Sequence, residues 1–327
     1  MRSLSVTAEQ WPLHEPFIIS RMTQLHGEIV VVEIRQGQAV GRGECERADF
    51  FDSSLAVVVD EVEAIRGQIE AGLERDELQN LLPSGPARNA VDCAMWDLQA
   101  KLTGTPVHQL AGLVGPMAPA TTVFTISLDT PEKMAADAKA NNHRPVLKLK
   151  LGREGDPQRV AAIREVAPDA RISVDANTGW SETQFIDYMP KLAALGVELV
   201  EQPFAPGNDA LLLNYKSPIP LAADESCLDR GSLADLAGKY AFVNIKLDKT
   251  GGLTEALALV EEAKSMGFGI MVGCNIGTSL AMAPGMIIAQ LASFVDLDGP
   301  LLLADDRQPG LNYDGSQITP PVAALWG

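Results

Sequence analysis

Between residues 121 and 297, short apolar segments end in charged side chains at nearly regular intervals. Lys150, Asp175, Glu201, Asp224 and Lys246 follow one another at spacings of 25, 26, 23 and 22 residues. An interval of this length holds one strand and one helix, and strands that alternate with helices form a parallel sheet. This repeat therefore predicts an α/β fold and limits the topologies that remain.

The repeat predicts eight strands, at residues 121–126, 146–151, 172–175, 198–201, 221–224, 242–247, 269–273 and 294–297. Eight such units favour a closed (β/α)7β-type TIM barrel, whose active site lies at the carboxyl ends of the strands. We therefore expect the charged residues at the strand ends to face one common mouth.

Residues 1–115 lack this alternation and predict a separate α+β capping domain. The apolar run 29–34 predicts a buried strand. Segments 55–70 and 86–102 predict helices, the first with Asp52 and Ser53 as possible caps and the second ending at Gly104. Two loops, 18–26 with Arg21 and 44–51 with Phe50 and Phe51, are candidates to reach a ligand. The expected organisation is a cap at 1–115, a barrel at 116–300, and a segment at 301–327 that packs back on the cap.

Composition narrows the class of partner and the compartment. The chain has 26 Lys plus Arg against 43 Asp plus Glu, a net charge of −17 that disfavours nucleic acid. Its four cysteines lack the C-x-x-C spacing of a zinc site or disulfide framework, which suits a reducing cytoplasm. We expect no membrane span, because the apolar run at 280–294 is short and interrupted by Pro284 and Gly285.

Lys148 and Lys150 lie two residues apart in the strand V-L-K-L-K-L and therefore share one face. A like charge nearby lowers the pKa of a lysine, which then serves as a general base near neutral pH. Taken alone, such a pair is more often part of a solvated strand face.

Asp175, Glu201 and Asp224 end three adjacent predicted strands. Three carboxylates form an all-oxygen site, which favours Mg²⁺ or Mn²⁺ over zinc. None of the four histidines falls at a carboxyl strand end, which excludes a histidine-rich metal site there. The alternative explanation is a set of structural salt bridges.

Lys246 ends the sixth predicted strand, four strands from Lys150 in a ring of eight. The two lysines would face each other across the barrel, with the metal between them. One could remove a proton from a carbon held over the metal while the other returns one to the opposite face. Mg²⁺ would neutralise the enediolate that forms when the α-carbon of a carboxylate loses its proton.

The motifs K-L-K, V-D-A-N, V-E-Q-P, A-D-E-S and N-I-K-L-D-K-T-G-G, in this order, resemble the enolase superfamily in its muconate lactonizing branch. A lysine base paired with Mg²⁺ is the known pattern of that superfamily. The resemblance implies Asp175, Glu201 and Asp224 as metal ligands and Lys150 and Lys246 as the acid/base pair. It also implies that Lys148 tunes the pKa of Lys150 and approaches the substrate carboxylate. Asn177 and Glu225 would support the metal ligands. The seventh strand ends G-C-N-I-G and lacks the histidine of the mandelate racemase branch.

Asp296 and Asp298 form a D-x-D pair that resembles that of the dipeptide epimerases, where it holds the substrate ammonium group. Flanking motifs resemble most the bacterial enzymes acting on Ala-Glu, which implies a dipeptide substrate and murein peptide metabolism. Some of these enzymes place a side-chain-binding arginine where Met22 stands here, so Arg21 is the candidate for that role. Thr125 and Cys274 lie at strand ends, as substrate contacts or as packing residues.

Three alternatives remain open at the level of sequence. The first is an epimerase for hydrophobic or basic dipeptides. The second is an o-succinylbenzoate synthase, N-acylamino acid racemase or cycloisomerase on the same scaffold. The third is a metal-stabilised binding protein without activity, against which the two opposed lysines argue. A homo-oligomer is compatible with each.

Overall fold

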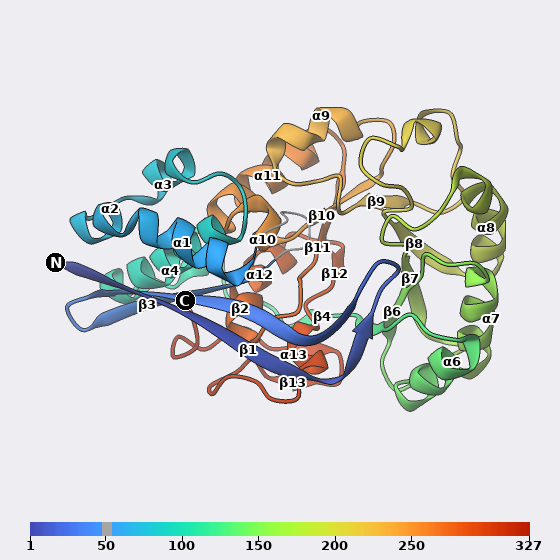
Figure 1. Cartoon of the computed structure of the whole chain (residues 1–327), viewed down its shortest axis with the longest axis horizontal. Helices are drawn as coiled ribbons and strands as arrows, with labels where there is room; N and C mark the ends of the chain where they lie inside the picture. Colours follow the sequence, from blue (N-terminus) through green and yellow to red (C-terminus); the bar gives the residue numbers. More distant parts are fainter. Residues whose placement is uncertain (48–53) are drawn as a thin grey trace.

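The computed structural model describes residues 1–47 and 54–327. Its N-terminal part is an antiparallel sheet of strands β1 (Arg2–Ile18), β2 (Thr23–Gln36) and β3 (Ala39–Glu46), in the order β1-β2-β3. Helices cover one face of this sheet (Figure 1): α1 (Leu55–Ala64), α2 (Arg66–Ala71), α3 (Arg75–Leu81) and α4 (Pro86–Thr103). We refer to these elements as the cap.

The middle of strand β2 is buried on both faces. Val30, Val32 and Ile34 pack into the core of the cap, whereas Ile29 and Val31 belong to the core that continues into the barrel. Successive side chains of a strand point to opposite faces, so two different cores require an uninterrupted apolar run. The burial of both faces explains the apolar sequence I-V-V-V. Because β2 contributes to both cores, it joins the cap to the rest of the molecule.

Glycines allow β3 to lie directly against α4. A Cβ atom on Gly41 would fall 2.1 Å from the Ala94 carbonyl oxygen, and one on Gly43 equally close to that of Ala90. Only glycine tolerates such an approach of two backbones. Helix α4 ends as predicted, with Gly104 in the left-handed conformation at φ 69°.

The second part is a barrel of parallel strands in sequence order from β5 to β12. The strands are β5 (Phe124–Ile126), β6 (Val146–Lys150), β7 (Arg171–Asp175), β8 (Val197–Glu201), β9 (Leu221–Ala223), β10 (Phe242–Ile245), β11 (Gly269–Val272) and β12 (Phe294–Val295). Across the seam between the first and the last, Val123 N donates to Val295 O at 3.0 Å. The predicted α/β barrel with a separate α+β unit is confirmed.

Helices follow the strands on the outside of the barrel (Figure 1). They are α6 (Pro131–Ala140), α7 (Asp156–Val166), α8 (Glu182–Ala194), α9 (Leu233–Leu236), α10 (Leu247–Thr250), α11 (Leu253–Ser265), α12 (Ser279–Ala289) and α13 (Gly299–Leu302). Within the described residues, none of the helices is both long and apolar enough to cross a bilayer.

Two predicted elements differ from the structure. Residues 120 and 121 leave the barrel as β4 (Ala120–Thr121), which pairs with β14 (Gln317–Ile318) beside β13 (Tyr313–Asp314). The helix predicted at 55–70 is interrupted at Ile65, and Ser54 is its N-cap. The proposed caps Asp52 and Ser53, like Phe50 and Phe51, lie outside the described residues.

Candidate active site

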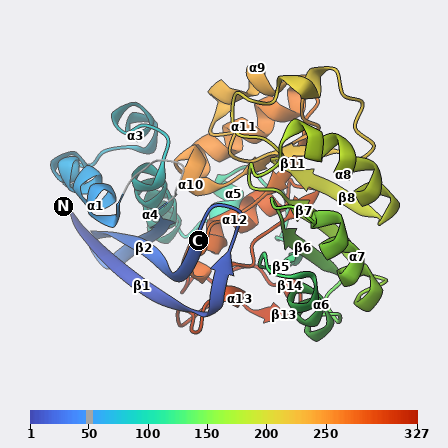
Figure 2. The same ribbon diagram turned by 45° about the vertical axis from the view of Figure 1, so that its right-hand side comes forward.

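The loop predicted at 18–26 is the tip of a long hairpin that reaches from the cap to the barrel mouth (Figures 1 and 2). Strands β1 and β2 extend to Ile18 and Thr23, so residues 19–22 alone form the turn. Ser20 Oγ donates to the Asn177 carbonyl oxygen at 3.0 Å, and Leu128 N donates to Ile18 O at 2.9 Å. The hairpin tip is thereby fixed over the strand ends.

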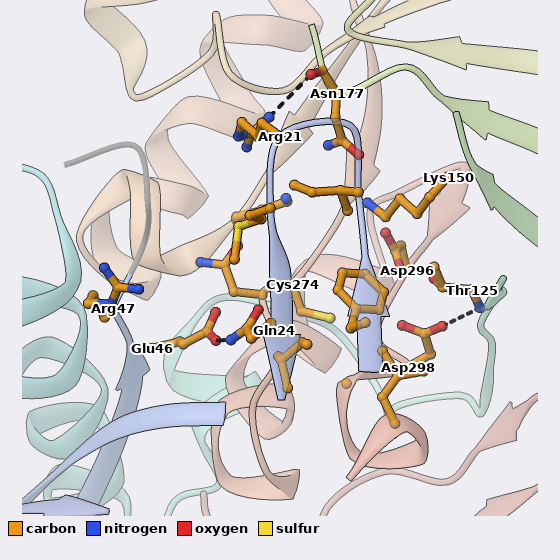
Figure 3. Close-up of a pocket in the computed structure, with 18 residues that line it drawn as sticks. Arg21, Gln24, Glu46, Arg47, Thr125, Lys150, Asn177, Cys274, Asp296 and Asp298 are labelled. Atoms are coloured by element: carbon orange, nitrogen blue, oxygen red, sulfur yellow. Dashed lines mark hydrogen bonds between the residues drawn. The ribbon is translucent and has the colours of Figure 1, made fainter. Parts of the chain in front are cut away.

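A pocket lies between this hairpin and the barrel mouth (Figure 3). The cap contributes Phe17, Ile19, Arg21, Met22, Gln24, Glu46 and Arg47, and the barrel contributes Thr125, Lys150, Asn177, Lys246, Cys274, Asn275, Ile276, Asp296, Asp298, Gly299 and Leu302. Most predicted site residues therefore line one cavity, together with cap residues that the sequence analysis did not identify.

Asp175, Glu201 and Asp224 are brought together by the ends of β7, β8 and β9. All three are buried, and one oxygen from each lies within 4.8 Å of the others. Ionised carboxylates at this separation repel one another unless a cation neutralises them. The donor set is all oxygen, so the cluster fits a hard divalent cation, and the predicted convergence of these three residues is observed.

The neighbouring charges and the burial shift the pKa values of these carboxylates unequally. Burial alone would raise the pKa of Asp175, but Lys150 and Lys148 outweigh it and lower the pKa to about 2. Burial and the neighbouring Asp175 raise the pKa of Glu201 to about 8. Glu201 thus has the least compensated negative charge of the cluster.

Lys150 and Lys246 approach the carboxylate cluster from opposite sides of the barrel. Lys150 Nζ lies 2.7 Å from Asp175 Oδ2, and Lys246 Nζ lies 2.8 Å from Asp224 Oδ2. Their strands, β6 and β10, are four positions apart in the sheet order. Both side chains also line the pocket, so a group bound there would lie between two amines.

Lys148 is more deeply buried than its neighbour Lys150. Its Nζ lies 2.6 Å from Glu201 Oε2, 2.7 Å from Asp296 Oδ2 and 3.3 Å from Asp175 Oδ2. Burial would lower the pKa of Lys148, but Asp296 and Glu201 more than offset it and raise the pKa well above its ordinary value. Asp296 and Glu201 are in direct contact with Lys148, so they affect its pKa more than a second lysine on the same strand face does.

Three buried residues that the sequence analysis did not assign hold the carboxylates in place. Lys249 Nζ donates to Asp224 Oδ1 at 2.5 Å, and Asn244 Nδ2 donates to Glu201 Oε1 at 2.6 Å. Gln202 Oε1 accepts from Asp224 N at 2.8 Å. Asn244 shares a strand face with Lys246, so the same two-residue period could have identified it.

Asn177 and Glu225 lie beside the carboxylates, where the sequence placed them. Asn177 has a positive φ of 42°, which lets its backbone N–H donate to Asp175 Oδ1 at 2.9 Å. Its Nδ2 donates to Asp175 Oδ2 at 3.2 Å. Burial and the adjacent Asp224 raise the pKa of Glu225. The strained backbone at Asn177 is thus coupled to the orientation of Asp175.

Asp296 and Asp298 follow β12 and face the pocket with Thr125 and Cys274 (Figure 3). Asp296 already has a cationic partner in Lys148, whereas Asp298 Oδ2 accepts from Thr125 N at 2.7 Å. Burial and the proximity of Asp296 raise the pKa of Asp298 to about 7. Of the two aspartates, Asp298 is the one whose charge is less compensated.

Arg21 lines the pocket, but its guanidinium is directed toward the barrel loops. Arg21 Nη1 lies 2.9 Å from Glu225 Oε1 and 3.2 Å from the Asn177 carbonyl oxygen (Figure 3). These contacts attach the hairpin tip to residues adjacent to two of the carboxylates. Met22 lies beside it in the pocket wall.

Comparisons with known proteins agree with this geometry. Residues 132–322 match the model "Enolase C-terminal domain-like", and residues 1–112 match "Mandelate racemase / muconate lactonizing enzyme, N-terminal domain". The L-Ala-D/L-Glu epimerase of Escherichia coli K12 is 42% identical, covering 97% of this chain and 99% of its own. An N-acetyl-D-glutamate racemase of a Pseudoalteromonas species is also 42% identical, covering 91% and 95%.

Among solved structures, an enolase family member from Agrobacterium tumefaciens with homology to dipeptide epimerases superposes with a TM-score of 0.98. It is 46% identical, covers 100% of both chains, and contains bound sodium and L-Ala-L-Glu. Together with the two family matches and the barrel-end carboxylates and lysines, this shows that the chain is a member of the mandelate racemase / muconate lactonizing enzyme family within the enolase superfamily.

Proposed function

We propose that this protein is a metal-dependent dipeptide epimerase that inverts the α-carbon of the C-terminal residue, with L-Ala-D/L-Glu as its substrate. The observation that carries the proposal is the pair Lys150 and Lys246 on opposite strands, with the carboxylate cluster between them. The epimerase from Escherichia coli and the L-Ala-L-Glu bound by the Agrobacterium protein support the choice of substrate.

Asp175, Glu201 and Asp224 would hold the metal, and their all-oxygen donor set favours Mg²⁺, with Mn²⁺ as the substitute. When bound, the cation supplies positive charge that stabilises the electrons left on the substrate carboxylate as the α-proton leaves. Lys148, buried beside Glu201, adds a fixed positive charge on the same side.

The two lysines then divide the proton transfer. In one direction Lys150 removes the α-proton from its face of the carbon, and Lys246 returns a proton to the opposite face, so the configuration inverts. The reverse reaction exchanges these roles. Asp298, assisted by Asp296, would hold the ammonium group of the N-terminal residue, because an ionised carboxylate is a strong acceptor for an ammonium.

Solvent-exchange measurements on single-lysine variants test the mechanism. In D₂O, Lys246→Ala should still exchange the α-hydrogen of one epimer without inversion, and Lys150→Ala should do so for the other epimer. NMR or mass spectrometry measures both exchanges, and EDTA should stop them in each protein. Interconversion of epimers at the wild-type rate by either variant would refute the two-base assignment.

A second candidate function is racemisation of an N-acylated amino acid such as N-acetylglutamate. Two observations favour it: the Lys148–Asp296 ion pair partly neutralises the D-x-D pair, and an N-acetyl-D-glutamate racemase is among the relatives. Comparing kcat/KM for L-Ala-L-Glu and N-acetyl-L-glutamate separates the two. The dipeptide should be preferred if Asp298 binds an ammonium group, whereas preference for the N-acetylated substrate would select the racemase.

We further propose that the protein works in a reducing compartment such as the cytoplasm, because its four cysteines are free thiols. The cap, residues 1–115, would select the substrate, and the barrel, residues 116–300, would carry the chemistry. Residues 301–327 would bind the two together.

A further inference from the structure

Lys246, one of the two proposed bases, is followed directly by the single helical turn α10 and by two glycines. Lys246 is the N-cap of this turn, and its carbonyl oxygen accepts from the backbone N–H groups of Lys249 and Thr250, each at 3.0 Å. Gly251 and Gly252 then adopt φ values of 74° and 112°, which favour glycine. The backbone at Lys246 is therefore coupled to the far end of this turn.

A residue of the cap, Arg88 on α4, holds that far end. Its Nη2 donates to the Thr250 carbonyl oxygen at 2.6 Å, and its Nε donates to the Gly251 carbonyl oxygen at 3.1 Å. A Cβ atom on Gly251 would fall 2.4 Å from Arg88 Nε, so a side chain there would displace the guanidinium. In Figures 1 and 2, α10 lies between α4 and the barrel strands. The cap thus contacts the turn that begins at Lys246.

Arg88 donates five hydrogen bonds to other described residues, and each acceptor is an uncharged oxygen. Three acceptors belong to the cap, namely the carbonyl oxygens of Gln79 and Leu82 and the hydroxyl group of Ser84. The other two are the carbonyl oxygens at the end of α10. The last carbonyl groups of a helix lack partners within it, and a cation stabilises them. The buried guanidinium therefore fixes the end of α10 relative to the cap.

A second side chain of α4, one turn after Arg88, holds the segment that follows. Asp92 is buried, and its carboxylate accepts from Thr254 N at 3.0 Å and from Thr254 Oγ1 at 2.6 Å, at the start of α11. A Cβ atom on Gly252 would fall 2.5 Å from Asp92 Oδ2. A cation thus lies at the end of α10 and an anion at the start of α11, which are the charges that these helix ends favour.

We propose that Arg88 is a positioning residue for Lys246: by fixing the end of α10 from the cap, it holds the Lys246 amine on its face of the substrate α-carbon. The proposal rests on the proposed epimerase function. Lys150 lies on β6, four positions away in the sheet order, and contacts Asp175 instead. Loss of Arg88 should therefore impair proton transfer on one face of the carbon and spare the other.

The test measures α-hydrogen exchange of L-Ala-L-Glu and L-Ala-D-Glu in D₂O. Exchange depends on Lys246 alone in a Lys150→Ala background and on Lys150 alone in a Lys246→Ala background. Adding Arg88→Met should lower the Lys246-dependent exchange at least tenfold and the Lys150-dependent exchange less than threefold. Mg²⁺ is kept saturating, because Lys249 on the same turn contacts Asp224. Equal losses in the two backgrounds would overturn the proposal.

Arg164→Met is the matched control. The Arg164 guanidinium also donates to backbone carbonyl oxygens, but these belong to the segments that precede β7 and β8, at the opposite rim of the barrel. This variant should change the ratio of the two exchange rates less than twofold. A shift as large as that of Arg88→Met would overturn the proposal, because the loss of any buried carbonyl contact would then produce it.

Arg88→Lys keeps the charge but not the planar fork that contacts two carbonyl oxygens, so it should show the same asymmetry with a smaller loss, of about threefold. If Arg88→Met does not fold, this variant decides, and equal losses in its two backgrounds would overturn the proposal. If wild type fails to epimerise L-Ala-L-Glu, the proposed function itself is wrong. That outcome is distinct from equal losses in an enzyme that turns over.

Discussion

Lys249 is a fully buried cation whose partners all belong to the carboxylate cluster and its supports. Its Nζ donates to both the carbonyl oxygen and Oδ1 of Asp224, each at 2.5 Å, and to the Asn244 carbonyl oxygen at 3.0 Å. Because Lys249 holds Oδ1 of Asp224, Oδ2 of Asp224 lies on the side of Lys246. We infer that Lys249 positions Asp224 as a ligand without touching the substrate.

Lys249→Met should therefore weaken Mg²⁺ binding tenfold or more, because Asp224 loses the donor that fixes its orientation. Isothermal titration with Mg²⁺ alone measures this, and the rise in Tm on adding Mg²⁺ gives a second readout that does not depend on turnover. Lys239→Met, which removes a lysine paired with the remote Asp209, is the control. Unchanged Mg²⁺ affinity in a folded Lys249→Met protein would contradict the assignment.

Asp298 supplies a pH-dependent prediction. Burial and Asp296 raise its pKa to about 7, so at pH 6 much of it is protonated and cannot attract an ammonium. We expect kcat/KM for L-Ala-L-Glu to rise between pH 6 and 8. Asp298→Asn should remove that rise and lower kcat/KM by roughly two to three and a half orders of magnitude, since breaking a buried charge pair costs about 3–5 kcal/mol. A variant that keeps the wild-type pH profile would exclude Asp298 as the ammonium site.

The residues that were predictable from sequence are those that follow the strand period. Asp175 and Glu201 end their strands, and the spacing between them reflects one βα unit. Gln202 and Lys249 lie beyond strand ends, in backbone whose course depends on tertiary packing. Their roles as donors and acceptors therefore had no periodic signal in the sequence.

At the scale of elements, β1 is the main feature that the sequence did not reveal. Most of its residues from Arg2 to Ile18 are exposed or half-buried, so apolar and polar side chains do not alternate clearly. The strand is held by its backbone pairing with β2, from Arg2 to Pro12 and again at Phe17 and Ile18. Pairing of this kind depends on the partner strand, and this explains why the sequence analysis assigned no strand before residue 29.

The hairpin tip suggests a role for Arg21 different from that of a side-chain receptor. Because Glu225 and the Asn177 carbonyl engage its guanidinium, Arg21→Met should weaken the attachment of the tip to the barrel, leaving the hydrogen bonds of Ser20 and Ile18. We expect kcat/KM to fall by a similar factor for L-Ala-L-Glu and L-Ala-L-Gln, measured in parallel. Arg35→Met, at an exposed position on β2, is the control. A loss confined to the acidic dipeptide would instead restore Arg21 as the receptor of the glutamate side chain.

At the scale of the whole molecule, Asp248 lies buried where cap and barrel meet. Its carboxylate accepts from Asn89 Nδ2 on α4 at 2.7 Å and from Asn275 Nδ2 in the pocket wall at 3.2 Å. Burial nevertheless outweighs these hydrogen bonds and raises the pKa of Asp248 to about 7. The interface thus contains a group that titrates near neutral pH.

The sign of the resulting effect on stability follows from proton binding. Between its ordinary pKa and about 7, Asp248 is protonated when folded but ionised when unfolded, so its contribution to stability falls as pH rises. Asp248→Asn lacks this dependence. The difference in unfolding free energy between wild type and variant should shrink by roughly 2 kcal/mol from pH 5 to pH 8, measured by urea titration. A difference that stays constant over this range would rule out titration of Asp248.

The last residues of the chain complete the first domain. Arg42 Nη2 on β3 donates to the Ala324 and Leu325 carbonyl oxygens, and Gly327 N donates to Asp97 Oδ1 on α4. In Figure 1 the C-terminus lies beside the cap sheet. Arg42 and Ala324 are 282 residues apart. At ribosomal rates of about 5–20 residues per second, the partners of Arg42 are made roughly 15 to 60 seconds after it. During translation the newly made cap must therefore wait, with this edge uncovered, until the entire barrel has been synthesised.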